Sequence, residues 1–206
     1  VGAADMGTGS DTVLAQIASE VLECNYDNVV VFSADTDTSP YDSGSYASST
    51  TYLTGKAVEQ ACIRLRESIQ NIGAALLKCD VDVTEFDGEY VYCLEEESEG
   101  VSLKDIATAS MFNNGYETQF TSSARSSVSP PPYMTGMVEI ELDKETGEVR
   151  VLGYEATVDC GTVINPNLAR LQTEGGIAQG IGMALYEDIT YDSLGGIREN
   201  SLIQYK

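Results

Sequence analysis

The chain has 206 residues, of which 42% are apolar, and a formal charge of −22 from 33 acidic and 11 basic residues. This composition allows a packed core and argues against general disorder, whereas so negative a surface argues against nucleic acid or an anionic membrane surface as a partner. Because His is absent, a Ser-His-Asp triad, a Cys-His pair and a His-ligated zinc site cannot be built from this chain alone.

The cysteines indicate a reducing compartment. Their number is odd and no Cys-x-x-Cys pair occurs, which argues against a disulfide framework, a zinc ribbon or an iron–sulfur site. No stretch of 18 apolar residues is present either. We therefore expect a cytoplasmic protein whose thiols are reduced and buried, namely Cys24, Cys62, Cys79, Cys93 and Cys160.

The first half of the chain predicts helices alternating with short strands. A strand end at residues 1–4 leads through a glycine-rich loop to a helix over residues 11–23, with Ser10 as its N-cap. A buried strand is expected at residues 29–32 and a long helix over residues 48–77. Two strands at residues 81–86 and 89–93 flank an Asp87-Gly88 turn, residues 95–99 form a solvated loop, and Ser102 caps a helix over residues 103–112.

The second half begins after a connection rich in Ser and Pro, residues 121–132, which we take as the boundary between two lobes. The first lobe covers residues 1–128 and the second residues 129–206, and the chain is expected to be incomplete at both ends. The second lobe holds a half-exposed hairpin of residues 137–142 and 149–158, a helix over residues 166–185 capped by Asn165, and a final hairpin. This irregular order predicts an α+β fold of two lobes, in which mixed sheets pack with helices.

Three segments have residue types suited to ligand binding. At residues 5–12 a glycine-rich loop enters a helix, so backbone N–H groups and the helix dipole suit a phosphate, provided that the carboxylate of Asp11 is turned away. Residues 44–51 place small hydroxyl side chains before the next helix. Gln172 precedes four glycines, each of which costs a helix about 1 kcal/mol relative to Ala, so another group must approach that backbone closely. Taken singly, each segment is also explained without a ligand, as a capped turn, a serine-rich cap or close helix packing.

Together, the segments DMGTGSDTVLAQIASEVL, GSYASSTTYLTGKAV and VEIELDKETGEVRVLGYEATVDCGTVINPNLARLQTEGGIAQGIGMALYE resemble the molybdopterin-binding large subunit of the xanthine dehydrogenase and aldehyde oxidoreductase family, the molybdenum hydroxylases. The resemblance covers nearly the whole chain and is loosest over residues 80–132. It implies a fold of the molybdenum-cofactor-binding type. It also implies which residues contact the cofactor, namely Met6, Gly7, Thr8, Gly9, Tyr46, Ala47, Ser48, Thr50 and Gln172.

The resemblance further implies a function. Enzymes of this family hydroxylate a carbon of an N-heterocycle or aldehyde with oxygen derived from water. The general-base Glu is expected beyond Lys206, so we expect neither a catalytic residue nor a direct metal ligand in this chain, which by itself should be inactive and free of cofactor. The expected cofactor is molybdenum–molybdopterin in its cytosine dinucleotide form.

The expected partners are the remainder of the molybdenum subunit and subunits or domains that hold [2Fe–2S] clusters and FAD, in a hetero-oligomer that acts on a small molecule. Two alternatives stay open at this point. One is a carbon monoxide dehydrogenase-type subunit, which belongs to the same family. The other is a non-catalytic acidic α+β module that binds a different phosphorylated ligand.

Overall fold

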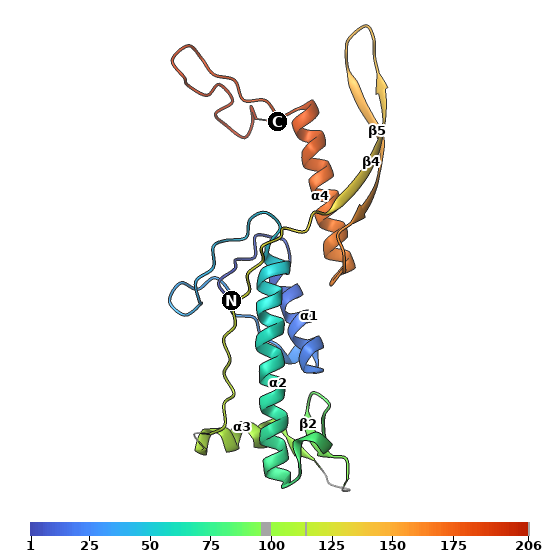
Figure 1. Cartoon of the computed structure of the whole chain (residues 1–206). Helices are drawn as coiled ribbons and strands as arrows, with labels where there is room; N and C mark the ends of the chain where they lie inside the picture. The colour runs from blue at the N-terminus through green and yellow to red at the C-terminus, as the bar shows by residue number, and fades with distance from the viewer. Residues whose placement is uncertain (96–99, 114, 206) are drawn as a thin grey trace. The chain divides into compact units, whose positions relative to one another are not determined.

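The computed structural model describes residues 1–95, 100–113 and 115–205. It divides the chain into two units, Val1–Val128 and Ser129–Lys206 (Figure 1). The division falls inside the stretch of residues 121–132 that is rich in Ser and Pro. Most of the loop predicted at residues 95–99 lies outside the described residues.

Two helices that pack against each other form the first unit's centre (Figure 1). Helix α1 spans Ser10–Leu22 and buries Val13, Leu14 and Ala18, whose spacing places them on one face. Helix α2 spans Gly55–Leu77 and is entered through a π-helical turn, Thr50–Thr54, rather than as an α-helix from residue 48. The predicted N-cap of α1 is also wrong, because Gly9 occupies that position in the left-handed conformation and Ser10 is the first helical residue.

A small sheet and a third helix pack around the C-terminal half of α2. Strands β1 (Thr84–Phe86), β2 (Tyr90–Cys93) and β3 (Val101–Ser102) are antiparallel, and short 3₁₀ turns lie at Tyr26–Asn28 and Val81–Val83. Helix α3 spans Leu103–Phe112 and is capped by Ser102 as predicted. These elements enclose the main core cluster, which consists of Ile69, Ile72, Phe86, Val91 and Ile106.

The strand predicted at residues 29–32 is absent. The segment is extended. Apart from the Val29 amide, which donates to the Tyr26 carbonyl of the preceding turn, its backbone hydrogen bonds among the described residues involve the chain start. There the N-terminal amine of Val1 donates to the Phe32 carbonyl at 2.8 Å and the Ala34 amide donates to the Val1 carbonyl at 3.1 Å. Val30 and Phe32 are 86% and 64% exposed, so the segment is not buried either. An apolar β-branched run forms a strand only where a neighbouring strand pairs with it.

The second unit contains one hairpin and one helix. Strands β4 (Tyr133–Leu142) and β5 (Val149–Asp159) are antiparallel, and helix α4 spans Pro166–Leu185 with the Asn165 side chain accepting from the Leu168 amide. The predicted final hairpin is reduced to a single bridge between Tyr191 and Ile197. The hairpin of β4 and β5 is exposed on both faces, which differs from the half-exposed pattern expected.

The α+β class is confirmed. Both sheets in the described part of the chain are antiparallel, where mixed sheets were predicted. None of the described helices is both long and apolar enough to cross a membrane.

Candidate functional site

The loop that leads into α1 is held in place by the carboxylate of Asp5. Its Oδ1 accepts hydrogen bonds from the backbone N–H groups of Gly7, Thr8 and Gly9 at 2.9, 3.0 and 3.1 Å, and its Oδ2 accepts one from Asp11 at 3.4 Å. Gly7 and Gly9 have φ angles of 87° and 76°, which glycine adopts without steric conflict. The N–H groups that were predicted to face a phosphate therefore face an anion of the protein itself.

The same hydrogen bonds control the ionisation of Asp5. Desolvation is the largest single effect and raises its pKa, but the hydrogen bonds from the four backbone amides together outweigh it, so the pKa lies below its usual 3.8. The carboxylate is charged at neutral pH, and a phosphate at these amides would meet that charge. The prediction that the amides are open to a phosphate is thus wrong. Contacts from other atoms of this loop to a cofactor stay a prediction.

The carboxylate of Asp11 is turned away from the loop surface. Its Oδ2 accepts a hydrogen bond from the Ser33 hydroxyl at 3.0 Å, and its Oδ1 is buried. Asp11 is the acidic residue that was expected to disturb anion binding. The residue that actually interferes is Asp5. An acidic residue two to four positions before a pair of glycines is the sequence signal that could have identified it, because its side chain can reach the amides that such a turn exposes.

The outer surface of this loop is open. Met6 is 66% exposed, and a Cβ added to Gly7 would meet nothing within 4 Å. Thr8 is half-buried. The loop therefore presents the Met6 side chain, the Thr8 hydroxyl and an uncovered stretch of glycine backbone, to which a flat ligand could come close.

The second predicted segment is strained. Ala47 and Ser48 both have positive φ, 51° and 57°, and a left-handed conformation at two consecutive residues with a Cβ costs roughly 1–2 kcal/mol each. Neither of their backbone N–H groups donates a hydrogen bond to another described residue. The Tyr46 carbonyl, by contrast, accepts from both the amide and the hydroxyl of Ser49, at 3.1 and 2.7 Å. Strain together with unpaired donors is typical of a site that binds a ligand.

The structure brings these two segments together. The Ser45 hydroxyl donates to the Ala4 carbonyl at 3.0 Å, which joins the residue before Tyr46 to the residue before Asp5. A Cβ added to Gly2 would lie 2.3 Å from the Pro40 carbonyl oxygen, so the backbone at Gly2 and the backbone at Pro40, which precede the two segments in the chain, are in close contact. Ser45 was not among the predicted site residues. Its role depends on a contact between residues 41 positions apart, for which a single sequence gives no local signal.

Gln172 lies in the second unit, on the exposed surface of α4. Three of the four glycines that follow it have open space where a Cβ would be, namely Gly175, Gly176 and Gly180, whereas Gly182 meets the side chain of Glu187. Close helix packing within this unit therefore does not explain the glycines. Their exposed backbone is free to contact another group.

Glu174, which follows Gln172 by two residues, is paired. Its carboxylate accepts a hydrogen bond from Arg170 Nε at 2.6 Å. Among the described residues no three or more Cys, Asp or Glu side chains gather into a group that could hold a metal ion. The five cysteines are free thiols. The described residues of the three candidate segments offer hydrogen bonding from backbone and hydroxyl groups.

Comparison with known proteins gives one consistent family. A family model described as the molybdopterin cofactor-binding domain matches residues 1–206. Among curated proteins, the probable hypoxanthine oxidase XdhD of Escherichia coli K12 is 36% identical over an alignment of 205 residues that covers 94% of this chain and 20% of that protein. The xanthine dehydrogenase molybdenum-binding subunit of Escherichia coli O157:H7 is 31% identical over an alignment of 210 residues that covers 100% of this chain and 28% of that protein.

Solved structures agree with this result. The Cu,Mo-containing CO dehydrogenase in its carbon-monoxide-reduced state aligns with a TM-score of 0.79 and 26% identity, over all of this chain and 26% of the other. Quinoline 2-oxidoreductase from Pseudomonas putida 86 aligns with a TM-score of 0.77 and 29% identity, over 98% of this chain and 26% of the other. The chain thus spans between 20% and 28% of the length of these relatives.

Proposed function

We propose that this chain, which belongs to the molybdopterin cofactor-binding domain family, is the part of a molybdenum hydroxylase that holds the organic portion of its cofactor. The enzyme would be an oxidoreductase that hydroxylates a carbon of an N-heterocycle or aldehyde with oxygen derived from water. Relatives named as a hypoxanthine oxidase and a xanthine dehydrogenase subunit are 36% and 31% identical, against 26% for a CO dehydrogenase large chain. A relative named 6-hydroxypseudooxynicotine dehydrogenase complex subunit gamma is also 31% identical, so these identities favour a heterocycle or aldehyde hydroxylase over the CO dehydrogenase type without selecting one substrate.

One observation carries the proposal. The glycine loop before α1 and the strained segment of residues 46–50 adjoin each other through the Ser45–Ala4 hydrogen bond, and that segment keeps the backbone N–H groups of Ala47 and Ser48 unpaired. The edge of a pterin is a planar array of hydrogen-bond donors and acceptors. Two neighbouring backbone donors beside an open glycine surface suit a group of that kind.

The fit differs between the two ends of the cofactor. The pterin fits the strained segment, because the donors there are free. A phosphate does not fit the amides of Gly7, Thr8 and Gly9, because Asp5 already occupies them. We therefore assign this loop a packing contact made by the Met6 side chain, the Thr8 hydroxyl and the backbone surface of Gly7 and Gly9. The complete proposed set of contact residues is Met6, Gly7, Thr8, Gly9, Tyr46, Ala47, Ser48, Thr50 and Gln172.

The molybdenum centre, when bound, supplies the oxygen transfer and accepts the substrate's electrons. The residues of this chain bind and orient it. We assign no general base to the chain, and its Glu174 is paired with Arg170. A base must reach the proton that it removes, and a carboxylate already held by a guanidinium is poorly suited to that role.

The finer identity of the cofactor and the partners belongs to the same proposal. We propose the cytosine dinucleotide form, with [2Fe–2S] clusters and FAD carried by partner subunits or domains in the cytoplasm. The relative named a molybdenum-binding subunit supports a multi-subunit enzyme.

The test is to purify the full-length polypeptide that contains this chain, together with the proteins that copurify with it. Metal analysis and fluorescence of the oxidised pterin should each give about one equivalent per polypeptide, and mass spectrometry should identify the nucleotide. A non-catalytic binding module would instead yield some other phosphorylated ligand and no molybdenum, which would refute the proposal. Copper beside the molybdenum and oxidation of carbon monoxide would favour the CO dehydrogenase type over a heterocycle or aldehyde hydroxylase.

A further inference from the structure

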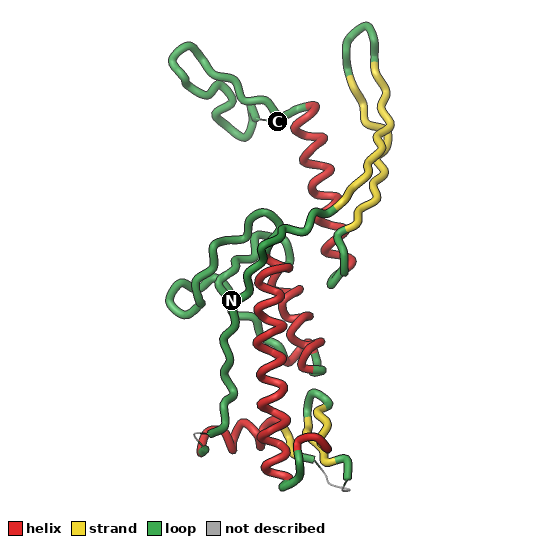
Figure 2. Tube along the Cα trace, viewed as in Figure 1, coloured by secondary structure: helices red, strands yellow, loops and turns green. Residues whose placement is uncertain are grey.

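An extended segment of the first unit, residues 117–128, runs along α2 and is defined here as the strap (Figure 2). Within the described residues, no backbone-to-backbone hydrogen bond involves the strap. Its contacts with the helix are made by side chains. Such a segment keeps its place only as firmly as these side-chain contacts hold it.

The contacts follow one row of α2 and the turn before it. Tyr52, Gln60, Arg64 and Ser68 are separated by multiples of four residues, so they lie along one side of the helix. Their partners in the strap have decreasing residue numbers, so the strap runs antiparallel to the helix. The pairs are Tyr52 with Ser126 at 3.3 Å, Gln60 with Ser122 at 2.9 Å, Arg64 with the Thr121 carbonyl at 3.2 Å, and Ser68 with the Glu117 carbonyl. Arg64 also lies 5.0 Å above the ring of Phe120.

The direction of the Tyr52–Ser126 hydrogen bond follows from the fact that the Ser126 hydroxyl has only one proton to donate. The Ser126 hydroxyl donates its single proton to the Val128 carbonyl at 2.6 Å and accepts from the Val128 amide at 3.1 Å. Tyr52 must therefore be the donor in the Tyr52–Ser126 hydrogen bond. Removing the Tyr52 hydroxyl deletes this contact and leaves the local turn of Ser126 and Val128 intact.

Tyr52 connects the strap to the strained segment. It sits in the π-helical turn Thr50–Thr54, which only Ser49 separates from the left-handed residues Ala47 and Ser48. Both a π-turn and two consecutive left-handed residues are less stable than regular helix, and they persist only where the surroundings hold them. On one side the turn is fixed by the Thr54 hydroxyl, which donates to Asp42 at 3.4 Å. The strap supplies a second fixed point through Tyr52.

We propose that the strap is a brace for cofactor binding, and that Tyr52 and Ser126 are positioning residues that keep the N–H groups of Ala47 and Ser48 oriented toward the pterin. This inference rests on the proposed function. Loss of the brace lets the strained segment relax without disturbing the core of α1, α2 and the small sheet. The expected result is a faster loss of cofactor from a protein that remains folded.

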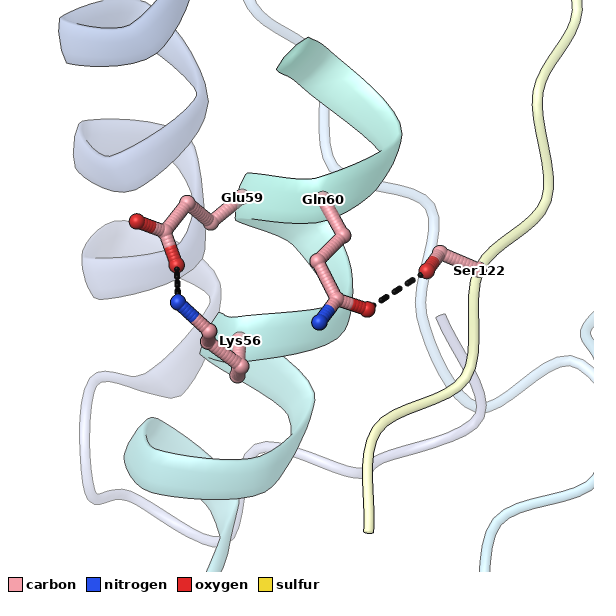
Figure 3. A network of polar contacts seen from close by, with 4 residues as sticks. All are labelled: Lys56, Glu59, Gln60 and Ser122. Atoms are coloured by element: carbon pink, nitrogen blue, oxygen red, sulfur yellow. Dashed lines mark hydrogen bonds and ion pairs between the residues drawn. The ribbon is translucent and has the colours of Figure 1, made fainter. Parts of the chain in front are cut away.

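The chain offers a matched control next to the brace (Figure 3). On α2 the side chain of Gln60 reaches Ser122 of the strap, whereas Lys56 on the neighbouring turn forms an ion pair with Glu59 of the same helix. Glu59→Gln removes an interaction of similar exposure that joins two residues of α2. It should leave the brace and the cofactor unaffected.

The experiment compares Tyr52→Phe, Ser126→Ala, their double variant and Ser126→Thr in the full-length polypeptide, with Glu59→Gln as control. Tyr52→Phe removes the single hydrogen bond between the helix turn and the strap and should accelerate molybdenum release during dialysis about threefold to fivefold. Ser126→Ala also removes the two hydrogen bonds to Val128 and should accelerate release at least as much, and the double variant should be no worse than Ser126→Ala, because the Tyr52 contact is already lost there. Ser126→Thr keeps a hydroxyl and should retain the cofactor as the wild type does.

Two readouts that need no bound cofactor test the brace itself. Hydrogen exchange of the amides of Ser49 and Leu53, which donate to the carbonyls of Tyr46 and Ser49, and tryptic cleavage at Arg125 in the strap, should both be faster in Tyr52→Phe than in Glu59→Gln. Faster exchange and cleavage with cofactor release at the wild-type rate would overturn the positioning role while leaving the proposed function intact. Unchanged exchange and cleavage would overturn the brace. Absence of molybdopterin from the purified wild-type protein would refute both the proposed function and this inference.

Discussion

Replacing Asp5 by Ala is expected to release the loop that precedes α1. The carboxylate accepts hydrogen bonds from the backbone N–H groups of Gly7, Thr8, Gly9 and Asp11. A side-chain cap at a helix start contributes about 0.5–2 kcal/mol. Solvent weakens each of the four hydrogen bonds, because Asp5 is exposed. We therefore do not count them separately, and assign to all four together only the upper value for a single cap, about 2 kcal/mol. That free energy corresponds to a roughly thirtyfold change in the equilibrium for opening the loop.

Hydrogen–deuterium exchange of the full-length polypeptide measures this equilibrium directly, because these amides exchange when the loop opens. Asp5→Ala should accelerate exchange in a peptide covering residues 6–11 roughly tenfold to thirtyfold, and Asp5→Asn, which keeps one acceptor oxygen, by less. Asp11→Asn is the matched control, because the Asp11 carboxylate accepts from Ser33 rather than from the loop. An exchange rate changed by less than twofold in Asp5→Ala would refute the role assigned to this carboxylate.

The same interaction predicts a dependence on pH. The folded pKa of Asp5 is lowered below 3.8, so its stabilisation is complete above the unfolded pKa and is lost as the pH falls through the folded value. The difference between wild type and Asp5→Asn should therefore be constant from pH 5 to 8 and shrink below about pH 3.8. A difference that grew with acidification would mean that the neutral form is the one that holds the loop.

Three further predictions concern the other predicted segments and the chain as a whole. Ser48→Pro cannot adopt a φ of 57° and lacks an amide proton, so it should lower the molybdenum content of the full-length protein roughly tenfold, whereas Ser48→Gly should preserve it. Gly180→Ala should increase the helicity of the isolated chain by circular dichroism, since Ala favours a helix by about 1 kcal/mol and its Cβ meets open space. If the exposed glycine backbone is approached by a ligand, the same change should lower the molybdenum content of the full-length protein. The 206-residue chain purified alone should contain far less than one molybdenum per molecule by metal analysis, and a stoichiometric amount would contradict that expectation.

The elements that could be predicted from the sequence are those whose ends depend on neighbouring residues. Helix α3 begins where Ser102 caps it, and α4 begins at Pro166 after Asn165, because each cap side chain reaches an amide three residues later. The hairpin of β4 and β5 follows from alternation on either side of an acidic and glycine-containing turn. Short-range chemistry decides all of these boundaries.

The predictions that were wrong concern features that depend on residues far away in the sequence. Residues 29–32 have strand composition but lack a paired neighbour, and no property of the segment itself reveals this. The entry to α2 becomes a π-turn, held through Tyr52 by a strap residue 74 positions away. At the candidate site the composition drew attention to the glycines before α1, but the decisive atoms are those of the Asp5 carboxylate. The segments could be found from residue types, whereas the hydrogen-bond partners that decide which donors are free required coordinates.

The hairpin shows most clearly what a hydrophobic pattern establishes. The register of β4 and β5 places apolar side chains opposite one another on one face, where Met134 pairs with Val158 and Val138 with Tyr154. These side chains are between 37% and 50% exposed, and none of the described residues of Ser129–Lys206 is buried. A lone hairpin is marginal in water, and an apolar face of this kind is normally covered. The alternation therefore encodes an apolar face that gains stability when another element covers it, which is why it is a clear pattern in the sequence although the face is exposed in this hairpin.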